Sequence, residues 1–119
     1  MFSESRLLIA ELVSESMTLG VSERELVQIL TGAPGSIETL RDEHRVTVII
    51  ETRMRRLLEM IKLLRDLCGD KSERWLQTPN SVLGLRTPLQ ALLQIPASLE
   101  GFLALMRIYH ADNPGVTIH

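Results

Sequence analysis

The feature that most constrains the fold is a stripe of apolar residues at helical spacing in the middle of the chain. Its six members recur at intervals of 4, 3, 4, 3 and 4: Ile50, Met54, Leu57, Ile61, Leu64 and Cys68. This spacing predicts a helix over residues 46–67 with one buried face. Further apolar residues flank the stripe: Leu58, Met60, Leu63 and Leu67. Such a helix is either central in its fold or half-buried against another chain, so the pattern also predicts self-association.

Shorter helices are expected on both sides of this long one. The first helix is expected at residues 5–17. Ser22-Glu-Arg-Glu25 is a capping box that begins a second helix, which ends at Gly32. Ser36 caps a third helix that runs to about residue 44. After Gly69, prolines divide the chain into helices at about 72–78, 81–84, 88–93 and 97–109. The predicted fold is all-α: a helix-turn-helix-like unit at residues 1–45, then residues 46–119, which hold the long helix and a C-terminal cluster of short helices.

Composition and charge narrow the class of protein. The single cysteine, Cys68, allows no intramolecular disulfide and favours a reducing compartment. The longest uncharged run, residues 87–99, contains two prolines and is shorter than the roughly 20 residues needed to cross a bilayer. The N-terminus lacks the pattern of a signal peptide. We therefore expect a soluble cytoplasmic protein with no membrane partner.

The sequence offers little for catalysis. The three histidines, His44, His110 and His119, have no partner at metal-ligand spacing. No glycine-rich phosphate loop or nucleophile elbow is present. We expect no enzymatic activity, no cofactor and no metal.

The helix-turn-helix outline at the N-terminus admits two interpretations, a DNA-binding unit or a scaffold. In the first, four residues reach bases or phosphates: Ser36, Thr39, Arg41 and Arg45. The second is favoured by charge, because Glu38, Asp42 and Glu43 would lie close to phosphates. Residues 1–45 carry eight acidic and four basic side chains, whereas residues 46–119 carry seven acidic and nine basic ones. Neither half has the basic excess of a strong nucleic-acid binder.

The most specific motif begins at the only tryptophan, Trp75. Its spacing is Trp-Leu-x-x-Pro-Asn-x-x-Leu-Gly-x-x-x-Pro-Leu, with the residues Trp75, Leu76, Pro79, Asn80, Leu83, Gly84, Pro88 and Leu89. Together with the preceding long helix, it resembles the C-terminal toxin-binding domain of the Xre/MbcA/ParS antitoxin family. The resemblance covers residues 46–115 best, and the N-terminal helices match the helix-turn-helix half of the family more loosely.

The resemblance implies an antitoxin of a type II toxin–antitoxin system. Its partner would be a RES-type toxin that consumes NAD or transfers ADP-ribose from it, and the antitoxin would occlude the toxin's active site. The implied toxin-binding residues are in the last helix and the tail: Arg107, Tyr109, His110, Asn113, Val116, Thr117, Ile118 and His119. Operator DNA is the second partner that the family implies, through autoregulation of the operon, and the expected assembly is a homodimer or a hetero-oligomer with the toxin.

Two other functions fit the same residues. The chain could be a dimeric helix-turn-helix transcriptional regulator without a toxin partner, in which residues 46–119 serve dimerisation. It could also be a helical adaptor with neither partner.

Overall fold

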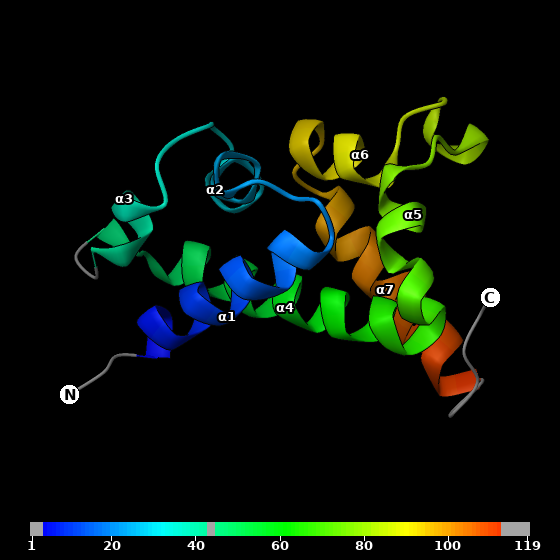
Figure 1. The fold of residues 1–119 in the computed structure, drawn as a ribbon, viewed down its shortest axis with the longest axis horizontal. Helices are drawn as coiled ribbons and strands as arrows, with labels where there is room; N and C mark the ends of the chain where they lie inside the picture. The colour runs from blue at the N-terminus through cyan, green and yellow to red at the C-terminus, as the bar shows by residue number, and fades with distance from the viewer. Residues whose placement is uncertain (1–3, 43–44, 113–119) are drawn as a thin grey trace. The chain divides into compact units, whose positions relative to one another are not determined.

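A computed structural model describes residues 4–42 and 45–112, and this part of the chain is α-helical (Figure 1). The elements in chain order are α1 (Glu4–Thr18), α2 (Glu23–Thr31), α3 (Glu38–Arg41), α4 (Val48–Cys68), the 3₁₀ turn η2 (Gly69–Lys71), α5 (Ser72–Gln77), the 3₁₀ turn η3 (Ser81–Leu83), α6 (Pro88–Gln94) and α7 (Ser98–Asp112). Within the described ranges, extended pairing is limited to one isolated bridge, between Asn80 and Arg86. The prediction of an all-α fold is confirmed.

The chain divides into two compact units, residues 1–58 and 59–119. The division lies inside α4, so each unit contains about half of that helix. The sequence had placed the boundary before the long helix, at residue 45. An apolar stripe shows that a helix is buried, but it does not show which neighbours bury each of its turns.

In the first unit, the ends of the helices follow the capping signals of the sequence. The backbone N–H of Glu25 donates to Ser22 Oγ at 3.1 Å, and that of Ser22 donates to Glu25 Oε1 at 3.0 Å, which completes the predicted capping box of α2. Gly32 ends α2 in the left-handed conformation, at φ 88°. Helix α3 is shorter than predicted, with four residues, because the backbone is already extended at Asp42.

Helix α4 is covered along most of its length. Met54, Leu57, Ile61 and Leu64 of the predicted stripe are buried, and so are the flanking residues Leu58, Met60 and Leu67. Large apolar side chains that α4 exposes among the described residues are confined to its first turn, at Val48 and Ile49. The wide apolar surface that motivated self-association is thus buried within the chain. Self-association stays a prediction, but the apolar surface of α4 no longer supports it.

The second unit is built on short helices with well-defined starts. Thr87 and Gln90 form a capping box at the N-terminus of α6, and Pro88 occupies the first turn, where its missing N–H has no consequence. Helix α6 contacts α5 and α7. One face of α7 is buried and consists of Leu99, Phe102, Leu103 and Met106. No helix in the described part of the chain has the length and hydropathy required to cross a membrane.

Candidate protein-interaction surface

The motif around Trp75 folds into α5, a tight turn and α6. The indole packs edge-on against Phe102 of α7, with ring centroids 5.7 Å apart and planes at 78°. Leu76, Pro88 and Leu89 are buried. These contacts explain why a large aromatic residue and a proline occur at positions 75 and 88, since their side chains provide a core for short helices that have little of their own.

Asn80 organises the turn between α5 and α6. Its side-chain Oδ1 accepts from the backbone N–H of Val82 at 2.9 Å, and its own N–H donates to the carbonyl of Arg86 at 3.0 Å. The carbonyl of Asn80 accepts from both Leu83 and Leu85. The turn is therefore held by hydrogen bonds at both ends, rather than by burial of its side chains.

The same turn presents two apolar side chains to solvent. Val82 is 89% exposed and Leu85 is 73% exposed. Leu85 has φ 68°, in the left-handed region that non-glycine residues rarely adopt, and it directly follows Gly84 at φ 67°. The turn thus holds a leucine outward in an unfavourable backbone conformation.

Helix α7 has a second apolar face, which is exposed. Leu105, Ile108 and Tyr109 are 47%, 59% and 48% exposed, and their spacing of three and four residues places them on one side of the helix. We call these three residues the α7 outer row. A cluster of exposed apolar side chains on an ordered helix is typical of a surface that binds another protein.

The predicted toxin-binding residues lie next to this row or beyond the described part of the chain. Arg107 forms two hydrogen bonds of 2.6 Å with the carboxylate of Glu59, and His110 Nε2 lies 3.3 Å from Asp66 Oδ2. Tyr109 belongs to the outer row itself. Asn113, Val116, Thr117, Ile118 and His119 lie outside the described residues.

The bond with Arg107 is the main reason that the pKa of Glu59 is lowered, and the pKa of Arg107 is raised in return. The Arg107 guanidinium is thus paired with Glu59 beside the outer row.

Leu105 and Ile108 were not among the contact residues predicted from the sequence. The signal was present, because both are apolar and lie outside the stripe that forms the buried face of α7. An apolar residue outside the buried stripe of an amphipathic helix is a candidate contact residue.

The predicted DNA-binding residues are engaged in local contacts. Arg41 pairs with Glu38, and Arg45 Nε lies 3.5 Å from Asp42 Oδ2. Ser36 Oγ accepts from the N–H of Glu38, and the Thr39 hydroxyl donates to the Ser36 carbonyl. Helix α3, which would be the recognition helix, is a single turn. The geometry therefore gives DNA binding no specific support.

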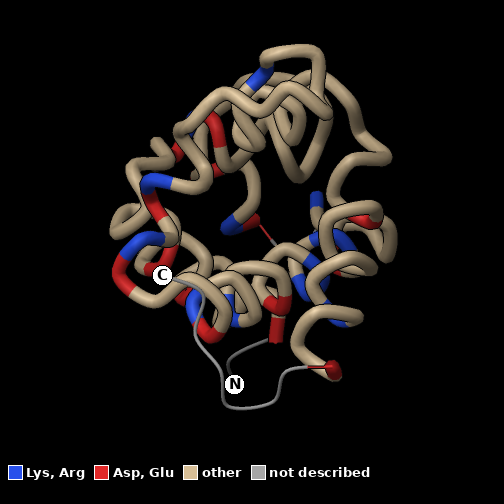
Figure 2. The backbone as a smooth tube through the Cα atoms, turned by 90° about the vertical axis from the view of Figure 1, so that its right-hand side faces the viewer, with Lys and Arg blue, Asp and Glu red and all other residues tan. Residues whose placement is uncertain are grey.

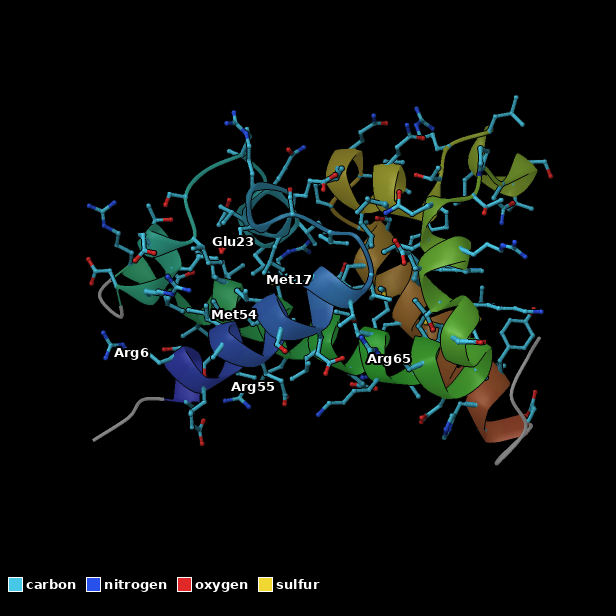
Figure 3. The ribbon with its side chains drawn as sticks, in the orientation of Figure 1. Arg6, Met17, Glu23, Met54, Arg55 and Arg65 are labelled. Atoms are coloured by element: carbon cyan, nitrogen blue, oxygen red, sulfur yellow. The ribbon has the colours of Figure 1, made fainter. Side chains whose placement is uncertain are left out.

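The basic side chains of α4 also have protein partners. Arg53 donates to the carbonyl of Ile29 near the end of α2, at 3.2 and 2.8 Å. Arg55, which lies beside α1 in Figure 3, donates to Glu4 and Glu51. Figure 2 shows basic and acidic positions interspersed along the backbone. These arginines thus serve the fold rather than forming a basic surface.

In the residues that the structure describes, no group of three His, Cys, Asp or Glu side chains is arranged to hold a metal ion. No protein-family model, curated protein or solved structure matches the chain.

Proposed function

We propose that this chain is an antitoxin that neutralises a RES-type, NAD-using toxin by covering its active site. The observation that carries the proposal is the α7 outer row, an exposed apolar face immediately before the C-terminal tail. The spacing of the Trp75 motif supports the same function. The assembly proposed is a hetero-oligomer of antitoxin and toxin.

The physical basis is a division of roles between the helix and the tail. Leu105, Ile108 and Tyr109 supply apolar area that is buried when the toxin binds, and burial of such area drives most protein association. Arg107 and His110 border the row as the polar rim, with Glu59 and Asp66 limiting their motion. The tail that follows Asp112 would then enter the cleft of the toxin and exclude the dinucleotide.

The transcriptional-regulator alternative has weaker support. Its recognition helix would be α3, with one turn. Arg41 in this helix and Arg45 after it are each paired with a neighbouring carboxylate. A binder of this kind would have few free cations to release counterions from DNA.

The test is co-expression with the protein encoded by the adjacent reading frame, which the proposal expects to be the toxin, scored by growth. The unchanged antitoxin should restore growth, and Ile108→Asp should weaken binding to the purified toxin by about tenfold or more, because it places a charge in an apolar interface. Deletion of residues 113–119 should weaken neutralisation while the helical content stays unchanged.

The matched control is Met17→Asp. Met17 is 69% exposed and belongs to the first unit, so the same change should leave toxin binding unaffected. Failure of the unchanged chain to restore growth would reject the antitoxin function. Equal binding by Ile108→Asp and Met17→Asp would reject the role of α7.

A further inference from the structure

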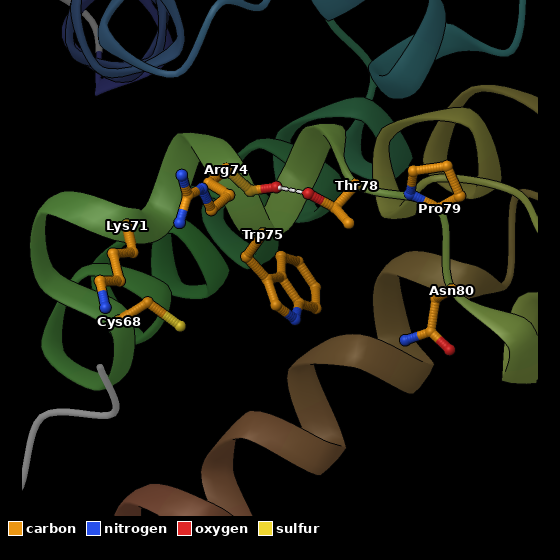
Figure 4. A pocket seen from close by; sticks show the side chains of 7 residues that line it. All are labelled: Cys68, Lys71, Arg74, Trp75, Thr78, Pro79 and Asn80. Carbon is orange, nitrogen blue, oxygen red and sulfur yellow. Dashed lines mark hydrogen bonds between the residues drawn. The ribbon is translucent and has the colours of Figure 1, made fainter.

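A second surface feature is a pocket of about 290 Å³ in the second unit (Figure 4). It lies where α4 ends and α5 leads into the turn. Its lining consists of Cys68, Lys71, Arg74, Trp75, Thr78, Pro79 and Asn80. The exposed lining residues Lys71, Arg74, Thr78 and Pro79 make it a shallow pocket that is open to solvent.

The polar groups of this pocket are mainly unused hydrogen-bond donors. Within residues 4–42 and 45–112, the side chains of Lys71 and Arg74 form no ion pair, and the Trp75 indole N–H has no acceptor. The oxygen of the Asn80 amide is bonded to Val82, which leaves the NH₂ group without a partner. Two cations and two neutral donors with no acid among the lining residues favour an anionic ligand.

Neighbouring acidic residues neither line this pocket nor pair with its two cations. Asp70 and Glu73 are adjacent to them in sequence, but neither lines the pocket, and neither pairs with Lys71 or Arg74. The lining of the pocket therefore carries two positive charges and no negative one.

The apolar part of the pocket favours a side chain over a simple ion. The indole of Trp75 and the ring of Pro79 supply apolar walls, and Cys68 adds its thiol. Trp75 rests on Phe102, which belongs to the buried face of α7. The volume of about 290 Å³ is at the lower end of the range of small-molecule sites and suits an apolar side chain with a carboxylate beside it.

We propose that this pocket binds an acidic peptide segment of a partner protein. One apolar side chain of the segment packs on the Trp75 indole, and an adjacent carboxylate lies between Lys71 and Arg74. Arg74 can bind a carboxylate with two N–H groups, whereas Lys71 acts as a point charge. The proposal goes beyond the antitoxin function, because it requires neither a toxin nor the α7 outer row.

The chain contains one tryptophan and one cysteine, and both line the pocket. The experiment uses the full chain and the blocked peptide acetyl-Asp-Phe-Glu-amide, with acetyl-Asn-Phe-Gln-amide as the uncharged analogue. The acidic peptide should change Trp75 fluorescence saturably and slow the alkylation of Cys68. The uncharged analogue should bind about tenfold more weakly, since it lacks the ionised acceptors. Added salt should weaken the binding of the acidic peptide, because it screens the charges.

The decisive variant is Lys71→Gln with Arg74→Gln, which should weaken binding of the acidic peptide by about tenfold. The matched control, Arg6→Gln with Arg24→Gln, removes two exposed charges from the first unit and should bind like the unchanged chain. Circular dichroism checks that both variants keep their helices. Equal binding of the two peptides, equal binding by the two double variants, or no saturable signal from the acidic peptide would overturn the proposal.

Discussion

At the scale of single residues, Trp75 has the clearest structural role. It is half-buried, and it contacts Phe102 from a helix of six residues. A helix this short is unstable alone, so its position depends on such tertiary contacts. The geometry thus gives the tryptophan of the motif a specific aromatic partner and a role in folding.

We predict that Trp75→Ala lowers the free energy of unfolding by about 2–3 kcal/mol, somewhat less than for a fully buried aromatic residue. Urea unfolding followed by circular dichroism measures the change. Tyr109→Ala removes an aromatic ring from an exposed position and should change stability by about 0.5 kcal/mol or less. If Trp75→Ala lowered the free energy of unfolding by less than Tyr109→Ala does, the anchoring role of Trp75 would be contradicted.

The second residue-scale prediction concerns the thiol of Cys68. Partial burial raises its pKa above the ordinary value of 9.0, because desolvation disfavours the thiolate. Alkylation of the folded protein should therefore reach its half-maximal rate at a higher pH than alkylation of the urea-unfolded protein. Iodoacetamide kinetics across pH measure both midpoints, and the opposite order would show that the thiol is activated rather than protected.

At the scale of elements, the turn between α5 and α6 combines rigidity with unfavourable backbone geometry. Gly84 and Leu85 both have positive φ, but only glycine adopts this conformation without steric cost. No atom lies within 3.4 Å of the position that a Cβ on Gly84 would take, so the cost of a side chain there comes from the backbone conformation.

Opposite effects are therefore expected at the two positions. Gly84→Ala should destabilise the protein by about 1 kcal/mol, and Leu85→Gly should stabilise it by a few tenths to about 1 kcal/mol. The measurement is the Tm of each variant relative to the Tm of the unchanged chain. Destabilisation by Leu85→Gly would mean that the leucine side chain makes contacts worth more than the backbone strain.

The ion pair between α4 and α7 gives a pH-dependent prediction within the second unit. Hydrogen bonds from Arg107 lower the folded-state pKa of Glu59 below its ordinary value of 4.5. The stabilisation that this ion pair gives is therefore fully present above about pH 4.5. It is lost as the pH falls through the folded-state pKa of Glu59. It should be small and sensitive to salt, because both side chains are substantially exposed.

The measurement is the difference in Tm between the unchanged chain and Glu59→Gln. The unchanged chain should be more stable at pH 6, and the difference should shrink progressively below about pH 4.5. A difference that grows on acidification would contradict the assignment.

At the scale of the whole molecule, the sequence predicted the helices well where their ends carry strong local signals. Ser22, Gly32 and Pro88 mark ends within about two residues of the observed ones. The third helix was predicted too long. Local contacts join Ser36 to Glu38 and Thr39, and Asp42 to Arg45, and only one helical turn remains between them.

The candidate surfaces were predicted only in part. The motif around Trp75 was found from its spacing, and Tyr109 of the outer row was named. Leu105 and Ile108 were missed because a sequence does not show which of two apolar faces the rest of the chain covers. The pocket was missed because it is formed by side chains from the end of α4, η2, α5 and the following turn, whose relative positions depend on tertiary packing.

One prediction belongs to the chain as a whole. A fragment of residues 46–119 keeps all of α4 but loses α1, α2 and α3, which complete the first unit. Met54 and Leu57, buried in the full chain, belong to that unit, so the fragment should expose them and self-associate. Light scattering of the fragment and of the full chain at equal concentration makes the comparison. A fragment no more associated than the full chain would show that the second unit alone covers α4.

Because α4 passes from one unit into the other without a break, its length is constrained in a way that the length of an ordinary linker is not. Inserting or deleting one residue near position 58 would turn every later side chain of the helix by about 100° around the axis. A loop absorbs such a change, but a helix transmits it into a packed core. An exchange between proteins at a cut inside α4 would therefore have to keep the number of residues in the helix, because the cut falls in a continuous helix and not in a flexible connection.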